Sequence, residues 1–146
     1  MSAPELKFPF ARELQEQHDA VRAAARWFQV DVERERASGC VSGREALAFL
    51  QMFREQLIRH FRFEETNGFE GGLGSSDADI QRWARELVGQ HRALEQRLDV
   101  LISRLESGDD RALPVPLLVE WRTFFGALHR HDAEENALLL WIEQET

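Results

Sequence analysis

Three clusters of helix-breaking residues divide this chain into long segments, each with helical periodicity. The clusters read ASGCVSG at 37–43, TNGFEGGLGSS at 66–76 and SGDDRALPVP at 107–116. Between them, apolar residues recur three and four positions apart, which is typical of amphipathic helices, whereas sustained strand-like alternation is lacking. The pattern predicts helices over approximately residues 11–36, 43–65, 77–106 and 115–144. Long helices joined by short connections favour an all-α fold, an antiparallel up-down-up-down four-helix bundle.

Polar residues mark two of the predicted helix starts. Ser42 followed by Glu45 forms a capping box, and Ser76 with Asp79 is a weaker version of the same pattern. Such residues accept hydrogen bonds from the free N–H groups of a first helical turn, so they favour the boundaries that the periodicity indicates.

Composition narrows the classes of function. The net charge is -8 without a basic cluster, which argues against binding to a nucleic-acid backbone. No apolar run approaches the roughly 20 residues of a membrane-spanning helix, and the start MSAPELKFPF lacks the pattern of a secretory signal. The single cysteine, Cys40, offers neither an internal disulfide nor a multi-cysteine zinc site, and we expect it to be incidental. We expect one cytoplasmic domain over residues 1–146.

A degenerate repeat relates the two halves of the chain. The first predicted helix contains LQEQHDAV (14–21) and the third contains LVGQHRAL (87–94). The second and fourth helices share a pattern of Phe, then Leu, His and Glu at the same offsets: Phe53, Leu57, His60 and Glu64 against Phe124, Leu128, His131 and Glu135. The two helical hairpins therefore resemble copies of one unit.

The repeat places ionisable side chains on the apolar faces of the helices. In the fourth helix, His131 and Glu135 fill a gap in the apolar stripe, whereas His129 lies about 200° around the helix from His131 and is expected at the surface. The same test selects six inward-facing residues: His18, His60, Glu64, His91, His131 and Glu135. Counted from the predicted helix ends, these residues lie at matched depths, so they should converge on one point.

Imidazoles and carboxylates buried together need a partner that neutralises them, because an unpaired buried charge is costly. Imidazole with carboxylate suits iron, manganese or zinc, and a His-x-x-x-Glu pair allows the carboxylate to bridge two ions. Other metal folds fit less well, since the chain lacks both the Glu-x-x-His of ferritin-like bundles and the His-Glu-x-x-His of zinc proteases.

The ordered set His18, His60-x-x-x-Glu64, His91 and His131-x-x-x-Glu135 resembles the hemerythrin-like, or HHE cation-binding, family. The resemblance covers roughly residues 10–142. It implies a non-haem di-iron centre bridged by both glutamates and an oxo or hydroxo group, with manganese or zinc as other metals that suit this set. By the same resemblance, His18 and His60 would share one iron, and His91 and His131 the other.

One position departs from the oxygen-carrying members of that family. They place a further histidine one turn after the ligand of the third helix, where this chain has Glu95. Glu95 is therefore either an extra carboxylate ligand or a surface residue in a salt bridge. The neighbouring acids Glu65, Asp132 and Glu134 are expected to be solvated, although one of them orienting an imidazole N–H stays open.

Three classes of function remain open. The first is binding of dioxygen, or of a related ligand such as NO or peroxide, for sensing or handling of oxygen or iron. The second is an enzyme-like role in peroxide or nitrosative stress or in iron release, which ligation by Glu95 would favour. The third is a metal-free helical interaction module. The resemblance favours a metal- and oxygen-binding protein over a classical enzyme, with no nucleic-acid or membrane partner; a protein partner and a homodimer are left open.

Overall fold

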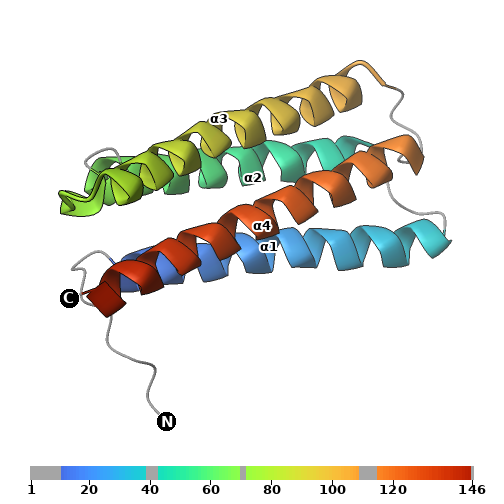
Figure 1. The fold of residues 1–146 in the computed structure, drawn as a ribbon. Helices are drawn as coiled ribbons and strands as arrows, with labels where there is room; N and C mark the ends of the chain where they lie inside the picture. Colours follow the sequence, from blue (N-terminus) through green and yellow to red (C-terminus); the bar gives the residue numbers. More distant parts are fainter. Residues whose placement is uncertain (1–10, 39–42, 70–71, 109–114, 146) are drawn as a thin grey trace, which may run out of the picture.

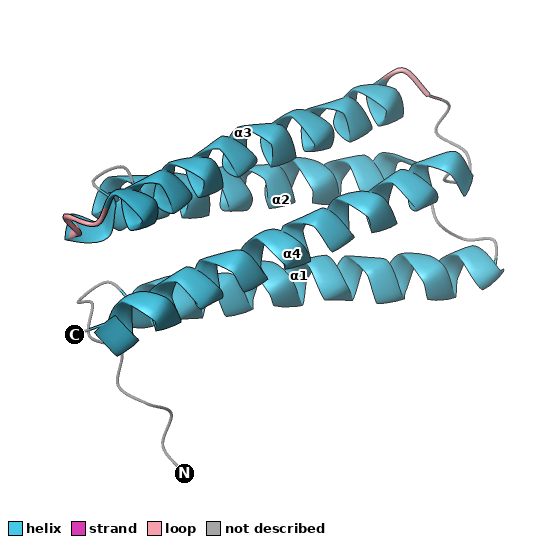
Figure 2. Cartoon of the chain, in the orientation of Figure 1, coloured by secondary structure: helices cyan, strands magenta, loops and turns pink. Residues whose placement is uncertain are grey.

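The protein forms four long helices that alternate in direction, as the periodicity predicts (Figure 1). The computed structural model describes residues 11–38, 43–69, 72–108 and 115–145. The long helices are α1 (Ala11–Ser38), α2 (Gly43–Glu64), α3 (Ala78–Glu106) and α4 (Val115–Glu145). Within these described ranges every regular element is helical (Figure 2). The all-α bundle is therefore confirmed.

The connection between α2 and α3 contains two short helical pieces, although the sequence predicts only a breaker segment there. A π-helical turn, η1 (Glu65–Phe69), follows α2 directly, and a 3₁₀ turn, η2 (Gly72–Gly74), precedes α3. Leu73 adopts a left-handed backbone with φ 57°, an unfavourable conformation for a branched residue, yet its side chain is buried. The connection thus closes one end of the bundle instead of looping away from it.

Buried apolar side chains gather in two clusters along the bundle axis. The larger cluster takes residues from all four long helices, among them Phe28, Phe53, Leu57, Leu98, Trp121 and Phe124. The smaller one lies at the end closed by η1 and η2 and contains Leu14, Phe69, Leu73, Ile80, Ala84, Leu87, Leu138 and Leu139. The layer between these clusters is polar and belongs to the candidate site described below.

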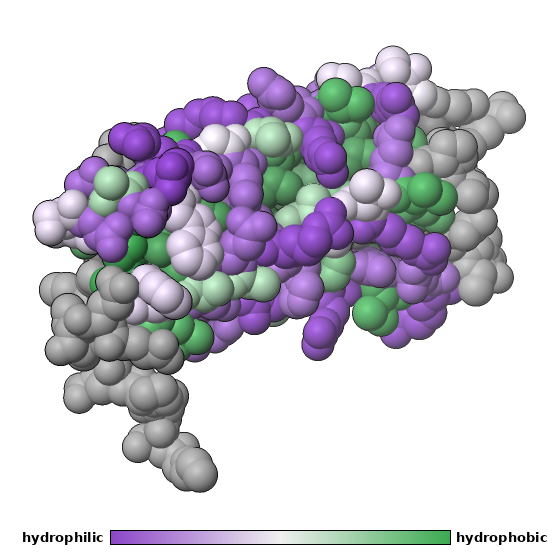
Figure 3. Space-filling view, viewed as in Figure 1, coloured by the Kyte–Doolittle hydropathy of each residue, from purple (hydrophilic) through white to green (hydrophobic). Residues whose placement is uncertain are grey.

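The outer surface is mixed, with hydrophilic side chains covering most of the face in Figure 3 and smaller apolar patches between them. None of the helices in the described part of the chain is long and apolar enough to cross a bilayer.

The start of α3 differs from the sequence-based expectation. The N-cap is Asp77, whose side chain accepts hydrogen bonds from the N–H groups of Asp79 and Ile80. The predicted cap, Ser76, lies one residue earlier and is exposed. An ionised cap is also favoured by the positive end of the helix dipole. The other predicted capping residue, Ser42, lies outside the described residues.

Loss of this cap should weaken the fold. We expect Asp77→Ala to lower the free energy of unfolding by about 1 kcal/mol, because two N–H groups of the first turn lose their acceptor. Urea unfolding of the metal-free protein measures the change. Ser76→Ala is the matched control and should shift the free energy by only a few tenths of a kcal/mol. An equal effect of both substitutions would show that Asp77 is not the cap.

Candidate metal centre

Each long helix contributes one buried histidine to the polar layer, and α2 and α4 each add a buried glutamate one turn later. The residues are His18 on α1, His60 and Glu64 on α2, His91 on α3, and His131 and Glu135 on α4. On α1, α3 and α4 these residues lie between a member of the smaller apolar cluster and a member of the larger one. On α2 they follow Leu57 of the larger cluster and precede Phe69 of η1, which belongs to the smaller one. The helical periodicity that builds the two apolar clusters therefore also brings the six side chains to one level.

These side chains form two ligand groups that share both glutamates. One group is His18, His60, Glu64 and Glu135, and the other is Glu64, His91, His131 and Glu135. Within each group the atoms available for a metal lie within 4.8 Å of one another. Two groups that share two carboxylates could hold a pair of cations bridged by those carboxylates.

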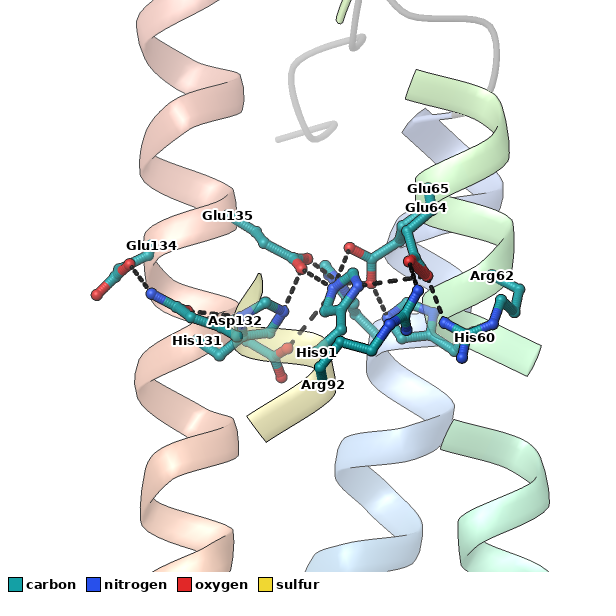
Figure 4. Close-up of polar contacts among 12 residues, drawn as sticks. His60, Arg62, Glu64, Glu65, His91, Arg92, His131, Asp132, Glu134 and Glu135 are labelled. Atoms are coloured by element: carbon teal, nitrogen blue, oxygen red, sulfur yellow. Dashed lines mark hydrogen bonds and ion pairs between the residues drawn. The ribbon is translucent and has the colours of Figure 1, made fainter. Parts of the chain in front are cut away.

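The distances around the glutamates show how the sharing arises (Figure 4). Nε2 of His18 lies 3.3 Å from Oε1 of Glu64 and 2.8 Å from Oε2 of Glu135. Nε2 of His91 lies 3.2 Å from Oε1 of Glu135 and 3.6 Å from Oε2 of Glu64. Each glutamate thus reaches histidines from both halves of the chain.

The two remaining histidines contact the glutamate of their own helix. Nε2 of His60 touches Oε1 of Glu64, and Nε2 of His131 touches Oε1 of Glu135. Even so, these two nitrogens, and Oε2 of both glutamates, are buried and make no well-aligned hydrogen bond among the described residues, although charged or polar atoms lie close to them. Buried polar atoms are normally satisfied, and these four all point into the same space between the helices. The donor set of imidazole nitrogens and carboxylate oxygens therefore fits iron and similar divalent ions.

The chain matches the model of the hemerythrin HHE cation-binding domain over residues 10–141. It belongs to this family. No curated protein and no solved structure gave a significant match. Membership in the hemerythrin HHE family makes this a cation-binding domain, and the His/Glu layer is its candidate site.

In this hemerythrin-like domain, two glutamines contact the ring nitrogens of two histidines that point away from the glutamates. Nδ1 of His60 lies 3.0 Å from Oε1 of Gln17, and Nδ1 of His131 lies 2.8 Å from Oε1 of Gln90. The amide nitrogen of Gln17 faces Glu13, and that of Gln90 donates to Glu134 over 2.9 Å. Since an amide oxygen can only accept, both imidazoles carry their proton on Nδ1 and leave Nε2 free for a cation.

The Gln-His pairs of the sequence repeat now have a structural reason. Gln17 and Gln90 directly precede His18 and His91, but each glutamine supports the histidine of the neighbouring helix. One Gln-His dipeptide thus supplies an inward ligand and a support for the ligand beside it. The sequence shows this dipeptide twice but does not indicate which histidine each glutamine contacts.

The repeat is broken at the residue that follows each inward histidine of α2 and α4. On α2 this residue is Phe61, which stacks on His91 with ring centroids 4.0 Å apart. On α4 it is Asp132, whose Oδ1 lies 4.0 Å from Nε2 of His18 and whose Oδ2 lies 3.9 Å from Nε of Arg22. One half of the site therefore has an aromatic wall, and the other has a buried acid.

The prediction that Glu65 and Asp132 are solvated was wrong. Glu65 is 1% exposed and Asp132 is 4% exposed. Glu65 is the first residue of η1, so the helix changes from α to π geometry at the point where two successive acids are buried. For Asp132 the repeat holds a signal, since its counterpart in the first half is Phe61, an apolar residue that is fully buried.

Two other residues lie where the sequence predicts, and for Glu95 the structure favours one of the two predicted roles. His129 and Glu134 are exposed, as expected. Among the described residues, Glu95 belongs to neither ligand group and instead lies 3.1 Å from Arg62 and 3.2 Å from Arg92, which favours its salt-bridge alternative. Cys40 lies outside the described residues.

Burial and mutual contacts shift the pKa values of several side chains in the polar layer. Burial, and then the charge of Glu135, raise the pKa of Glu64 well above its ordinary value. Burial alone would lower the pKa of His18, but its contact with Glu135 outweighs this and raises it above 6.5. Burial and the neighbouring His18 lower the pKa of His60 to about 3. These directions favour a proton on Glu64 and on His18 in the metal-free site, whereas the low pKa of His60 keeps it neutral at physiological pH.

Binding of a cation should release these protons. Below the raised pKa of His18 a proton competes with the cation, and above that pKa the competitor is gone, so the affinity for Zn²⁺ should rise with pH. Each displaced proton contributes about a tenfold change in affinity per pH unit. Calorimetric titration in buffers of different ionisation enthalpy counts the protons released. An affinity that is independent of pH near neutrality would contradict this assignment of protons.

Proposed function

We propose that this domain holds two iron ions and binds dioxygen, or a related small ligand such as NO or peroxide, at the pair. His18 and His60 would bind one iron, His91 and His131 the other, and Glu64 and Glu135 would bridge them. The observation that carries the proposal is the sharing of both buried glutamates by two four-residue ligand groups. Manganese or zinc would suit the same donors.

A metal-free interaction module fits the structure poorly. It would have to bury two carboxylates and four imidazoles at a cost that their contacts with one another offset only in part. Four of the buried atoms in this layer also make no well-aligned hydrogen bond among the described residues. A cation pair satisfies all of them at once.

The reduced iron pair, when bound, would supply two electrons to the ligand. The chain's own part is to shape the space around it. Phe61 covers the face of His91 and keeps water from that side. On the His18 side, Oδ1 of Asp132 lies 4.0 Å from Nε2 of His18, and burial raises the pKa of this carboxyl. A ligand on this side would meet the polar carboxyl group of Asp132, and one on the other side the apolar ring of Phe61.

The alternative is an enzyme-like role in peroxide or nitrosative stress or in iron release. A metal bond from Glu95 would favour this role. The pairing of Glu95 with Arg62 and Arg92 removes that support and favours reversible binding of a ligand.

The metal content of purified protein tests the proposed function. We expect two irons per chain in the wild type and loss of iron in His131→Ala and Glu135→Ala, since each substitution removes an atom from a ligand group. Elemental analysis measures this, and circular dichroism checks that the helices remain. His129→Ala is the matched control, because this exposed histidine lies two residues from His131 and should leave the iron content unchanged.

The response to a ligand separates binding from turnover. An anaerobically reduced, iron-loaded protein should form an adduct with dioxygen or NO whose absorption disappears when the gas is removed. Irreversible bleaching or sustained consumption of peroxide would instead favour the enzyme-like role. Wild-type protein that takes up no metal after reconstitution would overturn the proposal.

A further inference from the structure

The Nδ1 atom of His91 is the starting point, because its surroundings differ from those of His60 and His131. Those two histidines face neutral amide oxygens of Gln17 and Gln90. Nδ1 of His91 is buried and lacks a hydrogen-bond partner among the described residues. The nearest recorded oxygen is Oε2 of Glu65, 3.7 Å away. A shift of about 0.8 Å would bring the two atoms to hydrogen-bond distance.

Two arginines hold the Glu65 carboxylate in place (Figure 4). Nη1 of Arg62 donates to Oε2 over 2.6 Å, and Nη2 of Arg92 donates to Oε1 over 2.6 Å. Charge-assisted bonds to both oxygens make a buried anion tolerable and fix its position. The side chain of Glu65 therefore presents a negative charge at a defined place behind His91.

The arginines alone do not explain why this acid is buried. Glu95 pairs with the same two arginines, at 3.1 Å from Arg62 and 3.2 Å from Arg92, and it does so from a more exposed position. A partner at the surface would have satisfied the arginines without the desolvation of Glu65. What distinguishes Glu65 from Glu95 is its proximity to His91.

We propose that Glu65 is a positioning residue for the metal centre: its carboxylate accepts the Nδ1–H of His91, fixes that tautomer and makes His91 a stronger donor than His60 and His131, whose Nδ1 atoms face amide oxygens. This inference rests on the proposed function, since it needs a cation on Nε2 of His91. An imidazole bonded to a carboxylate is more basic than one bonded to an amide. An iron on Nε2 of His91 would therefore be easier to oxidise than it would be if His91 faced an amide instead of Glu65.

Substitutions at Glu65 and Glu95 test the inference. Glu65→Gln keeps the shape and removes the charge, and Glu65→Ala removes the acceptor. Glu95→Gln is the matched control, because it removes a charge from the same two arginines without touching His91. Circular dichroism and urea unfolding of the metal-free variants show whether each one folds.

Three measurements report on His91 itself. In zinc-loaded protein, proton NMR should show a downfield Nδ1–H resonance of His91 that moves upfield in Glu65→Gln and is unchanged in Glu95→Gln. Zinc affinity should fall about 10–100-fold in Glu65→Ala and less in Glu65→Gln. In iron-loaded protein, Glu65→Gln should raise the reduction potential of the centre, whereas Glu95→Gln should not.

Two results would overturn the inference and leave the proposed function intact. One is a wild-type resonance, affinity and potential that persist in Glu65→Ala. The other is an equal effect of Glu65→Gln and Glu95→Gln, which would assign Glu65 to the arginine cluster alone. Wild-type protein that binds neither zinc nor iron would overturn both the inference and the proposed function.

Discussion

The arrangement of the bundle core depends on two carboxylates buried at its centre. Glu64 and Glu135 are fully buried, and neither would be stable there as an isolated anion. Four neighbouring imidazoles offset part of the cost of burying these carboxylates. In the metal-free state the raised pKa of Glu64 favours its neutral form, and in the proposed loaded state cations would neutralise both glutamates. The supporting glutamines and the apolar clusters on either side serve to hold this one arrangement of charge.

The repeated hairpin explains the symmetry of the layer, and its departures explain the asymmetry. Gln17 and Gln90 do the same task in the two halves, as do Glu64 and Glu135. Phe61 and Asp132 occupy equivalent positions but bring opposite chemistry to the site. The two candidate ligand groups therefore share both glutamates and differ in what surrounds their histidines.

The sequence was sufficient for the fold and for the convergence of the six inward residues, because both follow from one periodicity. It was insufficient where a neighbour on another helix decides the outcome. Glu65 is buried because the chain enters a π-helical turn and because Arg92 of α3 reaches it. Glu95 pairs with Arg62 of α2, which no local pattern indicates. At the start of α3, adjacent polar residues competed for the cap, and periodicity does not distinguish Ser76 from Asp77.

The division of the apolar core has a consequence for how the molecule opens. A layer of ionisable groups separates the smaller cluster, around Leu14, Phe69 and Leu138, from the larger one. Apolar packing is therefore not continuous along the bundle. In the metal-free molecule this layer contributes little apolar packing between the two clusters. The end closed by η1 and η2 can therefore unfold locally as a separate cooperative unit. Cations bound in this layer, as proposed, would connect all four helices there. Amide hydrogens near Phe69 would then exchange slowly only in the loaded state, which couples metal occupancy to the order of one end of the bundle.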